Sequence, residues 1–240
     1  MRAVTIYAVA DNGRTNLVGA LDVSTGQFTK IAQTTPLFFA ITSGPGDRLY
    51  GADVNSGNLF VIATSGATAQ FGSVTAPNAF YGLACPRSKG TFFADNLDTL
   101  SVTLYSIARN GKNSSVLGEL VGPDAGFIPT GNLAFGPDGQ LYFNYSTDKR
   151  NATNSQLYTV NTFTGALTAV GSGLGTQILA LFSDGTVLYG VDTFTNSDVG
   201  IYTIDTASGV ATRISTVTGL PHRGGYYIDA ASALFHHRGG

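Results

Sequence analysis

The sequence contains little charge and almost no cysteine. Cys85 is the only cysteine among 240 residues, so no internal disulfide can form. It has no histidine near it in the sequence, which favours a small buried hydrophobe over a reactive nucleophile. Charged residues make up 12% of the chain, well below the usual value of about 25%. With a net charge of −2 and no cluster of Lys or Arg, the chain is not expected to bind nucleic acid.

Long hydrophobic runs are also missing. No run reaches the roughly 18 residues of a membrane-spanning helix, so we expect no membrane insertion. Residues 1–11 lack the apolar segment of a secretory signal peptide. Low charge together with abundant Thr, Ser and Asn is typical of exported bacterial proteins. We therefore expect a secreted or periplasmic protein whose signal peptide is absent from this sequence, with a cytosolic location as the alternative.

The usual catalytic and metal-binding motifs are absent. The only histidines are His222, His236 and His237, too few and too late in the chain for a Ser-His-Asp or Cys-His system. There is no HExxH motif, no Cys/His ligand spacing and no phosphate-binding glycine loop. The sequence thus argues against these enzyme classes, and we predict no metal ligands from motifs. Residues 234–240 are predicted to be a tail outside the folded domain.

One short phrase recurs along the whole chain at a spacing of 43 to 49 residues. It reads as an aliphatic-aromatic strand that ends near an acid, and this period is typical of one four-stranded propeller blade. The copies are Ile6–Asp11 (IYAVAD), Leu49–Asp53 (LYGAD), Phe92–Asp95 (FFAD), Leu141–Tyr145 (LYFNY) and Leu188–Asp192 (LYGVD). We expect the aromatic residues at the second position to pack between neighbouring blades. They are Tyr7, Tyr50, Phe93, Tyr142 and Tyr189.

A second phrase follows each first one and reads as a strand that closes in a glycine turn. Its copies are Leu21–Gly26, Leu59–Gly66, Leu104–Gly111, Leu157–Gly165 and Ile201–Gly209. Alternating apolar and polar residues indicate strands, and the closing Gly supplies the positive φ of a hairpin turn. Apolar innermost strands are predicted ahead of the first phrase at Phe38–Ile41, Phe80–Ala84, Asn132–Phe135 and Ile178–Phe182.

Four complete sets of four strands fit between residues 37 and 218, and a fifth set is split between the chain ends. The N-terminal set lacks an innermost strand, whereas Gly225–Ala230 (GYYIDA) is an innermost strand without its own partner. Joining the two removes exposed sheet edges. The sequence therefore predicts an all-β fold: one five-bladed β-propeller over residues 1–233, built of four-stranded antiparallel blades and closed by the C-terminal strand on the N-terminal blade.

The phrases LYGVD (188–192), IYTIDTASG (201–209) and ILALFSDG (178–185) resemble the repeat of bacterial β-propeller proteins of the YncE-like and NHL-like kind. The resemblance covers nearly the whole chain. It rests on strand aromatics, turn glycines and hairpin aspartates, so it implies the propeller fold. It implies no activity, because such propellers include lyases, lactonases and binding scaffolds.

Candidate site residues come from the geometry of a propeller, in which the loops after the second strand and the loops between blades emerge at the same end. That end is expected to be acidic and to bind a ligand through Asp11, Asp53, Asp95, Asp124, Asp192, His222, Arg223 and Asp229. Converging carboxylates suit Ca²⁺ or sugar hydroxyls. In the alternative interpretation, each aspartate only accepts hydrogen bonds from its own turn.

Two functions remain open at this stage. The first is a non-catalytic, monomeric binding or scaffold protein for a protein, glycan or small molecule, and the scarcity of catalytic groups favours it. The second is a hydrolase or lyase that uses a metal or carboxylates at the axial funnel. A glycosidase would need paired carboxylates on the innermost strands. Only Asp229 is clearly placed there, with Asn132 as a neutral neighbour. The cofactor is unknown, with Ca²⁺ as the candidate.

Overall fold

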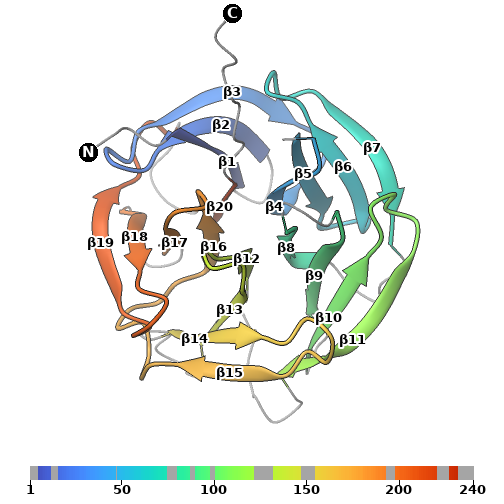
Figure 1. Cartoon of the computed structure of the whole chain (residues 1–240). Helices are drawn as coiled ribbons and strands as arrows, with labels where there is room; N and C mark the ends of the chain where they lie inside the picture. Colours follow the sequence, from blue (N-terminus) through green and yellow to red (C-terminus); the bar gives the residue numbers. More distant parts are fainter. Residues whose placement is uncertain are drawn as a thin grey trace, which may run out of the picture.

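The structure is a computed structural model that describes residues 5–11, 16–46, 48–74, 80–86, 90–97, 101–121, 132–146, 155–192, 198–220 and 227–231. These residues form five four-stranded antiparallel sheets arranged as blades around a central axis (Figure 1). The predicted five-bladed β-propeller is confirmed. The described residues contain no helix that is long and apolar enough to cross a membrane.

Each blade follows the same order from the axis outward. The first consists of β20 (Tyr227–Ala231), β1 (Thr5–Asp11), β2 (Asn16–Asp22) and β3 (Phe28–Thr34). The second consists of β4 (Phe38–Gly44), β5 (Arg48–Asp53), β6 (Asn58–Ile62) and β7 (Thr68–Ser73). The third consists of β8 (Phe80–Ala84), β9 (Phe92–Leu97), β10 (Val102–Ile107) and β11 (Ser114–Val121). The fourth consists of β12 (Leu133–Phe135), β13 (Leu141–Ser146), β14 (Ser155–Val160) and β15 (Leu167–Val170). The fifth consists of β16 (Ala180–Ser183), β17 (Leu188–Val191), β18 (Gly200–Ile204) and β19 (Ala211–Thr216).

The ring closes by pairing the two ends of the chain. β20 runs antiparallel to β1, with Tyr7 opposite Ala231 and Asp11 opposite Tyr227. The predicted strand Gly225–Ala230 is thus observed at Tyr227–Ala231, while residues 225 and 226 lie outside the described residues. Without β20, the inner edge of β1 would expose unpaired backbone groups.

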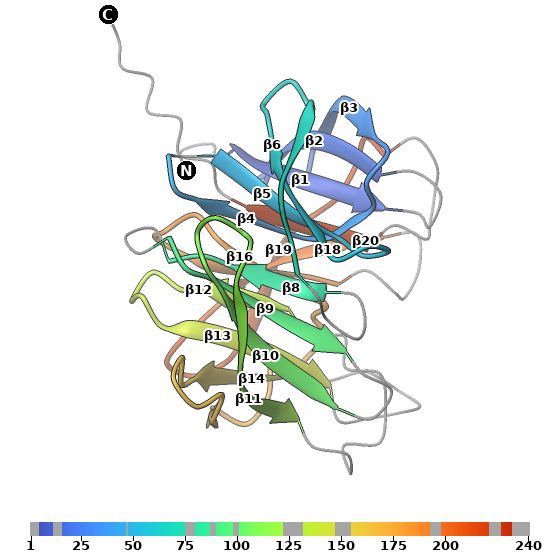
Figure 2. The ribbon, with the colours of Figure 1, turned by 90° about the vertical axis from the view of Figure 1, so that its right-hand side faces the viewer.

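The strands run between two ends of the ring, so the connections gather at those ends (Figure 2). At one end, which we call the hairpin end, tight hairpins join the third strand of each blade to the fourth and, in the second, fourth and fifth blades, the first strand to the second. At Gly139 and Gly185, φ is 78° and 89°, a conformation that favours glycine. The opposite, loop end holds the longer connections, most of which lie outside the described residues.

The core lies between blades, where the repeated aromatics pack. Tyr50 of the second blade contacts Phe92 of the third, with ring centroids 4.9 Å apart, and Phe93 contacts Phe135 of the fourth at 5.8 Å. Four of the five predicted aromatics are buried, and Tyr7 is half-buried. Their predicted place between blades is confirmed.

Candidate functional site

Residues at the same register position of the five innermost strands define one level of the axis. In four blades, this level is given by the pairing of the innermost strand with the second strand of the same blade. In the fourth blade, it is given by the hydrogen bond that the N–H of Asn144 donates to the carbonyl of Asn132, 3.4 Å away. In blade order the residues are Asp229, Ala40, Gly82, Asn132 and Ala180. Three of the five are Gly or Ala, so little bulk surrounds the two polar members.

Asp229 is fully buried at this level, with 0% of its surface exposed. Its Oδ2 accepts a hydrogen bond from the backbone N–H of Ile41, 2.7 Å away on the neighbouring blade. Burial raises the pKa of the Asp229 carboxyl well above its usual value, because the charged form is costly in a low-dielectric interior. Hydrogen bonds from Ile41 and from the side chain of Asn132 oppose this rise, whereas the charge of Asp95 adds to it.

Asp95 reaches the same level from β9, the second strand of the third blade, where it lies opposite Gly82. A Cβ atom on Gly82 would stand only 2.4 Å from Asp95 Oδ1 and 2.9 Å from the backbone N of Leu133. The missing side chain of Gly82 therefore makes room for the carboxylate. Asp95 is 2% exposed, and burial raises its pKa to about 7 against opposing backbone hydrogen bonds.

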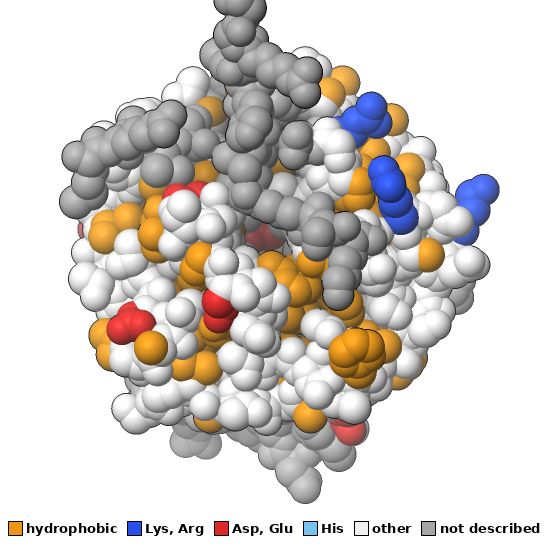
Figure 3. Space-filling view, in the orientation of Figure 1, with side chains coloured by type: hydrophobic (Ala, Val, Ile, Leu, Met, Phe, Trp, Pro, Cys, Tyr) orange, Lys and Arg blue, Asp and Glu red, His pale blue; other side chains and the backbone are white. Residues whose placement is uncertain are grey.

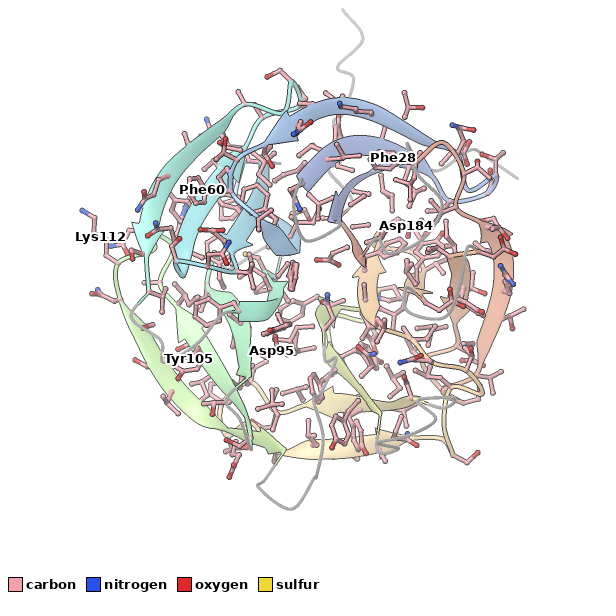
Figure 4. The ribbon with its side chains drawn as sticks, turned by 180° about the vertical axis from the view of Figure 1, so that it is seen from behind. Phe28, Phe60, Asp95, Tyr105, Lys112 and Asp184 are labelled. Atoms are coloured by element: carbon pink, nitrogen blue, oxygen red, sulfur yellow. The ribbon has the colours of Figure 1, made fainter. Side chains whose placement is uncertain are left out.

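Asp95, Asn132 and Asp229 form what we call the axial polar layer. The charge of Asp95 contributes to the raised pKa of Asp229, and no described basic side chain is among the causes of the pKa shift of either carboxyl group. The described Lys and Arg side chains are all exposed: Lys30, Arg48, Arg109, Lys112 and Arg213. Figure 4 shows Lys112 at the outer rim and Asp95 nearer the axis. The described part of the chain holds no group of three or more His, Cys, Asp or Glu placed to bind a metal.

A cavity of about 880 Å³ occupies the hairpin end of the axis. The wall of the cavity nearest the axis is an apolar collar. Each blade contributes one residue to it, the residue that directly follows Asp229, Ala40, Gly82, Asn132 or Ala180 in the sequence. The collar consists of Ile41, Leu83, Leu133, Leu181 and Ala230. Neither Asp95 nor Asp229 is among the described lining residues, so the axial polar layer lies one residue deeper than the collar.

The cavity extends from the collar into the space between the third and fourth blades. Phe93, Phe135, Phe163 and Phe182 form aromatic walls, and Thr42, Ser43, Thr91 and Ser106 supply hydroxyls. No Asp, Glu, Lys, Arg or His occurs among the described lining residues. Figure 3 shows hydrophobic side chains around the central hollow and acidic atoms at its base. The cavity can therefore hold an uncharged ligand without burying a charge against it.

Cys85 also lines the cavity. Its thiol is buried, and burial raises its pKa to about 12. The thiolate is the nucleophilic form, so this side chain is inert near neutral pH. The expectation of a small buried hydrophobe agrees with this environment.

Two of the predicted site residues are held within their own blades. Asp53 accepts hydrogen bonds from the backbone N–H of Leu37 and from the Ser56 hydroxyl. Asp192 accepts from the backbone N–H of Gly200 and, at 2.7 Å, from the Tyr202 hydroxyl. These contacts match the alternative in which each acid serves its own turn. A ligand-binding role for Asp53 and Asp192 stays a prediction.

Asp95 occupies a different register from the one that the repeated phrase indicated. Asp53 lies opposite Phe38, whereas Asp95 lies opposite Gly82, which is equivalent to Ala40 of the second blade. Asp95 is thus equivalent to Ala52 rather than to Asp53. Because side chains alternate along a strand, this one-residue difference places its carboxylate on the other face of the sheet, in the axial polar layer with Asp229.

The remaining predicted site residues lie outside the described part of the chain, in whole or in their side chains. Asp124, His222 and Arg223 lie outside the described residues, and of Asp11 only the backbone is described. The cavity at the hairpin end was not predicted from the sequence. Its lining is ordinary Leu, Phe, Ser and Thr, so only the spacing between blades reveals it.

Comparisons with known proteins show the fold alone. No family model matches the chain, and no curated protein matches its sequence. Among solved structures, the chain is similar to a protein of unknown function from Bacteroides thetaiotaomicron, with a TM-score of 0.59, 14% identity, and coverage of 97% of this chain and 66% of that one. A chain of a nidogen–laminin complex gives a TM-score of 0.58 at 14% identity over 95% of this chain and 99% of that one. A TolB-like protein from Agrobacterium tumefaciens gives 0.51 at 13% identity over 94% and 98%. The structural neighbours of this chain are thus β-propeller proteins of differing description.

Proposed function

We propose that this propeller is a non-catalytic binding protein that takes an uncharged, largely apolar small molecule into the cavity at its hairpin end. The observation that carries this proposal is the cavity of about 880 Å³, to which all five innermost strands contribute and whose described lining is uncharged. Small-molecule sites are typically concave and mostly apolar, with a few polar groups that orient the ligand. The hydroxyls of Ser43 and Thr91 line the cavity and could make such contacts.

Phe163 supports this proposal from the rim of the cavity. It is a large hydrophobic side chain with 85% of its surface exposed, and it belongs to the cavity lining. Its exposure has no packing explanation within the described residues, whereas a ligand that enters the cavity would cover it. A ligand at the hairpin end would sit at the end opposite to the acidic loops, which remain a second predicted binding surface.

The alternative function, a hydrolase or lyase that uses axial carboxylates, is favoured by the raised pKa of Asp95 and Asp229. A carboxyl group that is protonated near neutral pH can serve as a general acid. However, the apolar collar lies between these groups and the cavity. A cavity ligand would therefore have to pass the collar to reach them, and for this reason we favour binding over catalysis.

The binding proposal is tested by titration with N-phenyl-1-naphthylamine, an uncharged apolar dye that fluoresces in apolar sites. We expect saturable binding, and weaker binding of anilinonaphthalene sulfonate, because the described lining offers no positive charge to its sulfonate. Phe163→Ala should weaken dye binding by roughly tenfold through lost contact area. Val116→Ala is the matched control, because Val116 is a hydrophobic residue with 63% exposure that does not line the cavity.

A second pair of variants tests the position of the site. Thr91→Trp places a large side chain into the cavity and should abolish dye binding, whereas Thr29→Trp, on the exposed face of β3, should not. Circular dichroism and melting temperature show whether each variant is folded. Unchanged dye affinity in both Phe163→Ala and Thr91→Trp would overturn the proposal.

A further inference from the structure

The axial polar layer holds two carboxyl groups, and no described residue supplies a positive charge that would balance their ionised forms. Asp95 and Asp229 are 2% and 0% exposed, and they come from the third and first blades. Buried charges in proteins are normally paired or coordinate metals, because an isolated ion loses its hydration. Every Lys and Arg side chain that the structure describes is exposed instead. Among the described residues, therefore, no side chain supplies a balancing positive charge, which a proton or a bound cation would provide.

Each of the two carboxylates also has an oxygen without a hydrogen-bond partner. Asp229 uses Oδ2 to accept from Ile41, whereas its Oδ1 has no hydrogen-bond partner among the described residues. Asp95 Oδ1 is likewise unpartnered. Buried carboxylate oxygens are rarely left in this state, since the lost hydration is costly. Two such atoms on interacting carboxylates indicate a ligand that neither side chain supplies.

The surroundings of these oxygens favour a small ligand on the axis. At the same level, the second, third and fifth blades contribute Ala40, Gly82 and Ala180, so none of these three residues extends a large side chain to the centre. Asn132, the fourth blade's residue at this level, adds an amide group that hydrogen-bonds to Asp229. Acidic atoms are visible at the base of the central hollow in Figure 3, below the hydrophobic side chains that surround it.

We propose that the axial polar layer binds one hard divalent cation, with Ca²⁺ as the best fit, through the carboxylates of Asp95 and Asp229. The donor atoms are all oxygens, which Ca²⁺ prefers, and its irregular coordination tolerates carboxylate, carbonyl and water ligands together. The two positive charges of one divalent ion balance the negative charges of two ionised carboxylates. The cation joins strands from non-adjacent blades across the axis and so acts as a structural tie. This proposal is independent of dye binding in the cavity, because the collar separates the two sites.

The first test is thermal denaturation of the full chain, dialysed against EGTA at pH 7.5, with and without added Ca²⁺. A ligand that binds only the native state raises the melting temperature. We expect a rise with Ca²⁺ and, in isothermal titration calorimetry, a stoichiometry of one ion per chain. Asp95→Asn and Asp229→Asn should each weaken Ca²⁺ binding by roughly a hundredfold, because each removes a charged ligand. These isosteric amides remain neutral and should preserve the fold.

Asp205→Asn is the matched control. Asp205 is an exposed acid that accepts hydrogen bonds from Ala207 and Ser208 of its own turn, so its replacement should leave Ca²⁺ affinity unchanged. This control separates the axial site from weak binding by surface acids.

A spectroscopic measurement keeps the proposal testable if a variant fails to fold. Tb³⁺ replaces Ca²⁺ on oxygen ligands and emits when a nearby tyrosine absorbs light. Tyr81, whose pKa is raised by burial and by the charge of Asp95, is the candidate sensitiser. Tyr81→Phe should reduce the emission without changing Ca²⁺ affinity.

Three results would overturn the cation site. The first is a wild-type melting temperature that does not respond to Ca²⁺, Mg²⁺ or Mn²⁺ and changes only with pH. This result would mean that protons alone neutralise the two carboxylates. The second is a Ca²⁺ response that persists in both Asp→Asn variants. The third is Tb³⁺ emission that Ca²⁺ does not displace.

Discussion

The turn aspartates and the axial aspartates place the same side chain in opposite environments. Asp22, in the turn after β2, accepts hydrogen bonds from the backbone and hydroxyl of Ser24, and its pKa is lowered. At Asp184, in the hairpin after β16, burial raises the pKa, but several hydrogen bonds, led by those from Thr186, outweigh it. Asp95 and Asp229 are more deeply buried, and their pKa values are raised.

The difference shows what determines the role of an aspartate in this repeat. In a turn, neighbouring N–H and O–H groups surround the carboxylate, so the charged form is stable and each acid serves its own blade. At the axis, burial outweighs the few backbone N–H groups that donate, such as that of Ile41 to Asp229, and each carboxylate keeps an oxygen without a partner among the described residues. Among the described aspartates, only the axial ones therefore keep a buried carboxylate oxygen that could bind a ligand.

Gly82→Ala should have the largest effect, because its new Cβ would meet Asp95 Oδ1 and the backbone of Leu133 at the short distances given above. We expect a loss of about 2–3 kcal/mol in the free energy of unfolding, as in other overpacked interiors. The measurement is urea denaturation. The control is Gly139→Ala, whose Cβ has open space and whose φ of 78° alone costs about 1 kcal/mol. If the two variants lose equal stability, Gly82 does not make room for Asp95.

The pH dependence of stability should come next in size. The pKa of Asp95 is about 7 in the folded protein against 3.8 for the free side chain, so the folded state binds the proton more tightly. The free energy of unfolding should therefore fall as the pH rises from about 4 to 7, by about 2 kcal/mol between pH 5 and pH 7. Asp229 acts in the same direction.

The measurement is urea denaturation across this pH range in buffer that contains a chelator. Asp95→Asn should flatten much of the slope, and Asp22→Asn, as the matched turn variant, should not. A wild-type curve in which stability increases over this range would contradict the assignment of Asp95 as a protonated, buried acid.

The sequence was sufficient to predict the blade count, the closure and the interblade aromatics. These features repeat, and five copies at a regular spacing define each position: Tyr50, Tyr142 and Tyr189 are buried as the repeat requires. Features that occur in only one blade are harder to predict from the sequence. Asp95 was grouped with Asp53 because both end the same phrase, although Asp95 follows its aromatic by two residues and Asp53 follows Tyr50 by three.

The number of residues between the aromatic and the aspartate was the sequence signal for the position of Asp95. A difference of one residue places a side chain on the opposite face of the strand. The convergence of Asp95 and Asp229 required more, because these residues are far apart in the chain and meet only when the ring is closed. The cavity had no sequence signal at all. It depends on how far apart the third and fourth blades stand, which no local pattern encodes.

Asp192→Ala should have a moderate effect on stability and should weaken the fifth blade alone. It removes the acceptor of the Tyr202 hydroxyl and of the Gly200 N–H, so we expect a loss of about 1–2 kcal/mol in the free energy of unfolding. Tyr202→Phe removes only the hydroxyl bond and should lose less. If Asp192→Ala instead leaves stability unchanged but abolishes Ca²⁺ binding, the loop end holds the cation and the turn assignment is wrong.

Asp53→Asn should have the smallest effect on stability, because Asp53 is a turn aspartate whose hydrogen bonds an asparagine can also make. The amide retains Oδ1 as an acceptor for the Leu37 N–H at 3.0 Å, and the Ser56 hydroxyl can rotate to accept from the new NH₂ group. We expect a change of about 0.5 kcal/mol or less in the free energy of unfolding. Asp229→Asn is the axial counterpart. In the metal-free protein at pH 7.5 it should stabilise the fold, because a neutral amide replaces a buried acid whose charged form is costly there. Urea denaturation of the two variants side by side measures this difference in sign. If both variants destabilise equally, burial does not distinguish the axial aspartates from the turn aspartates, and a bound cation would no longer be required at the axis.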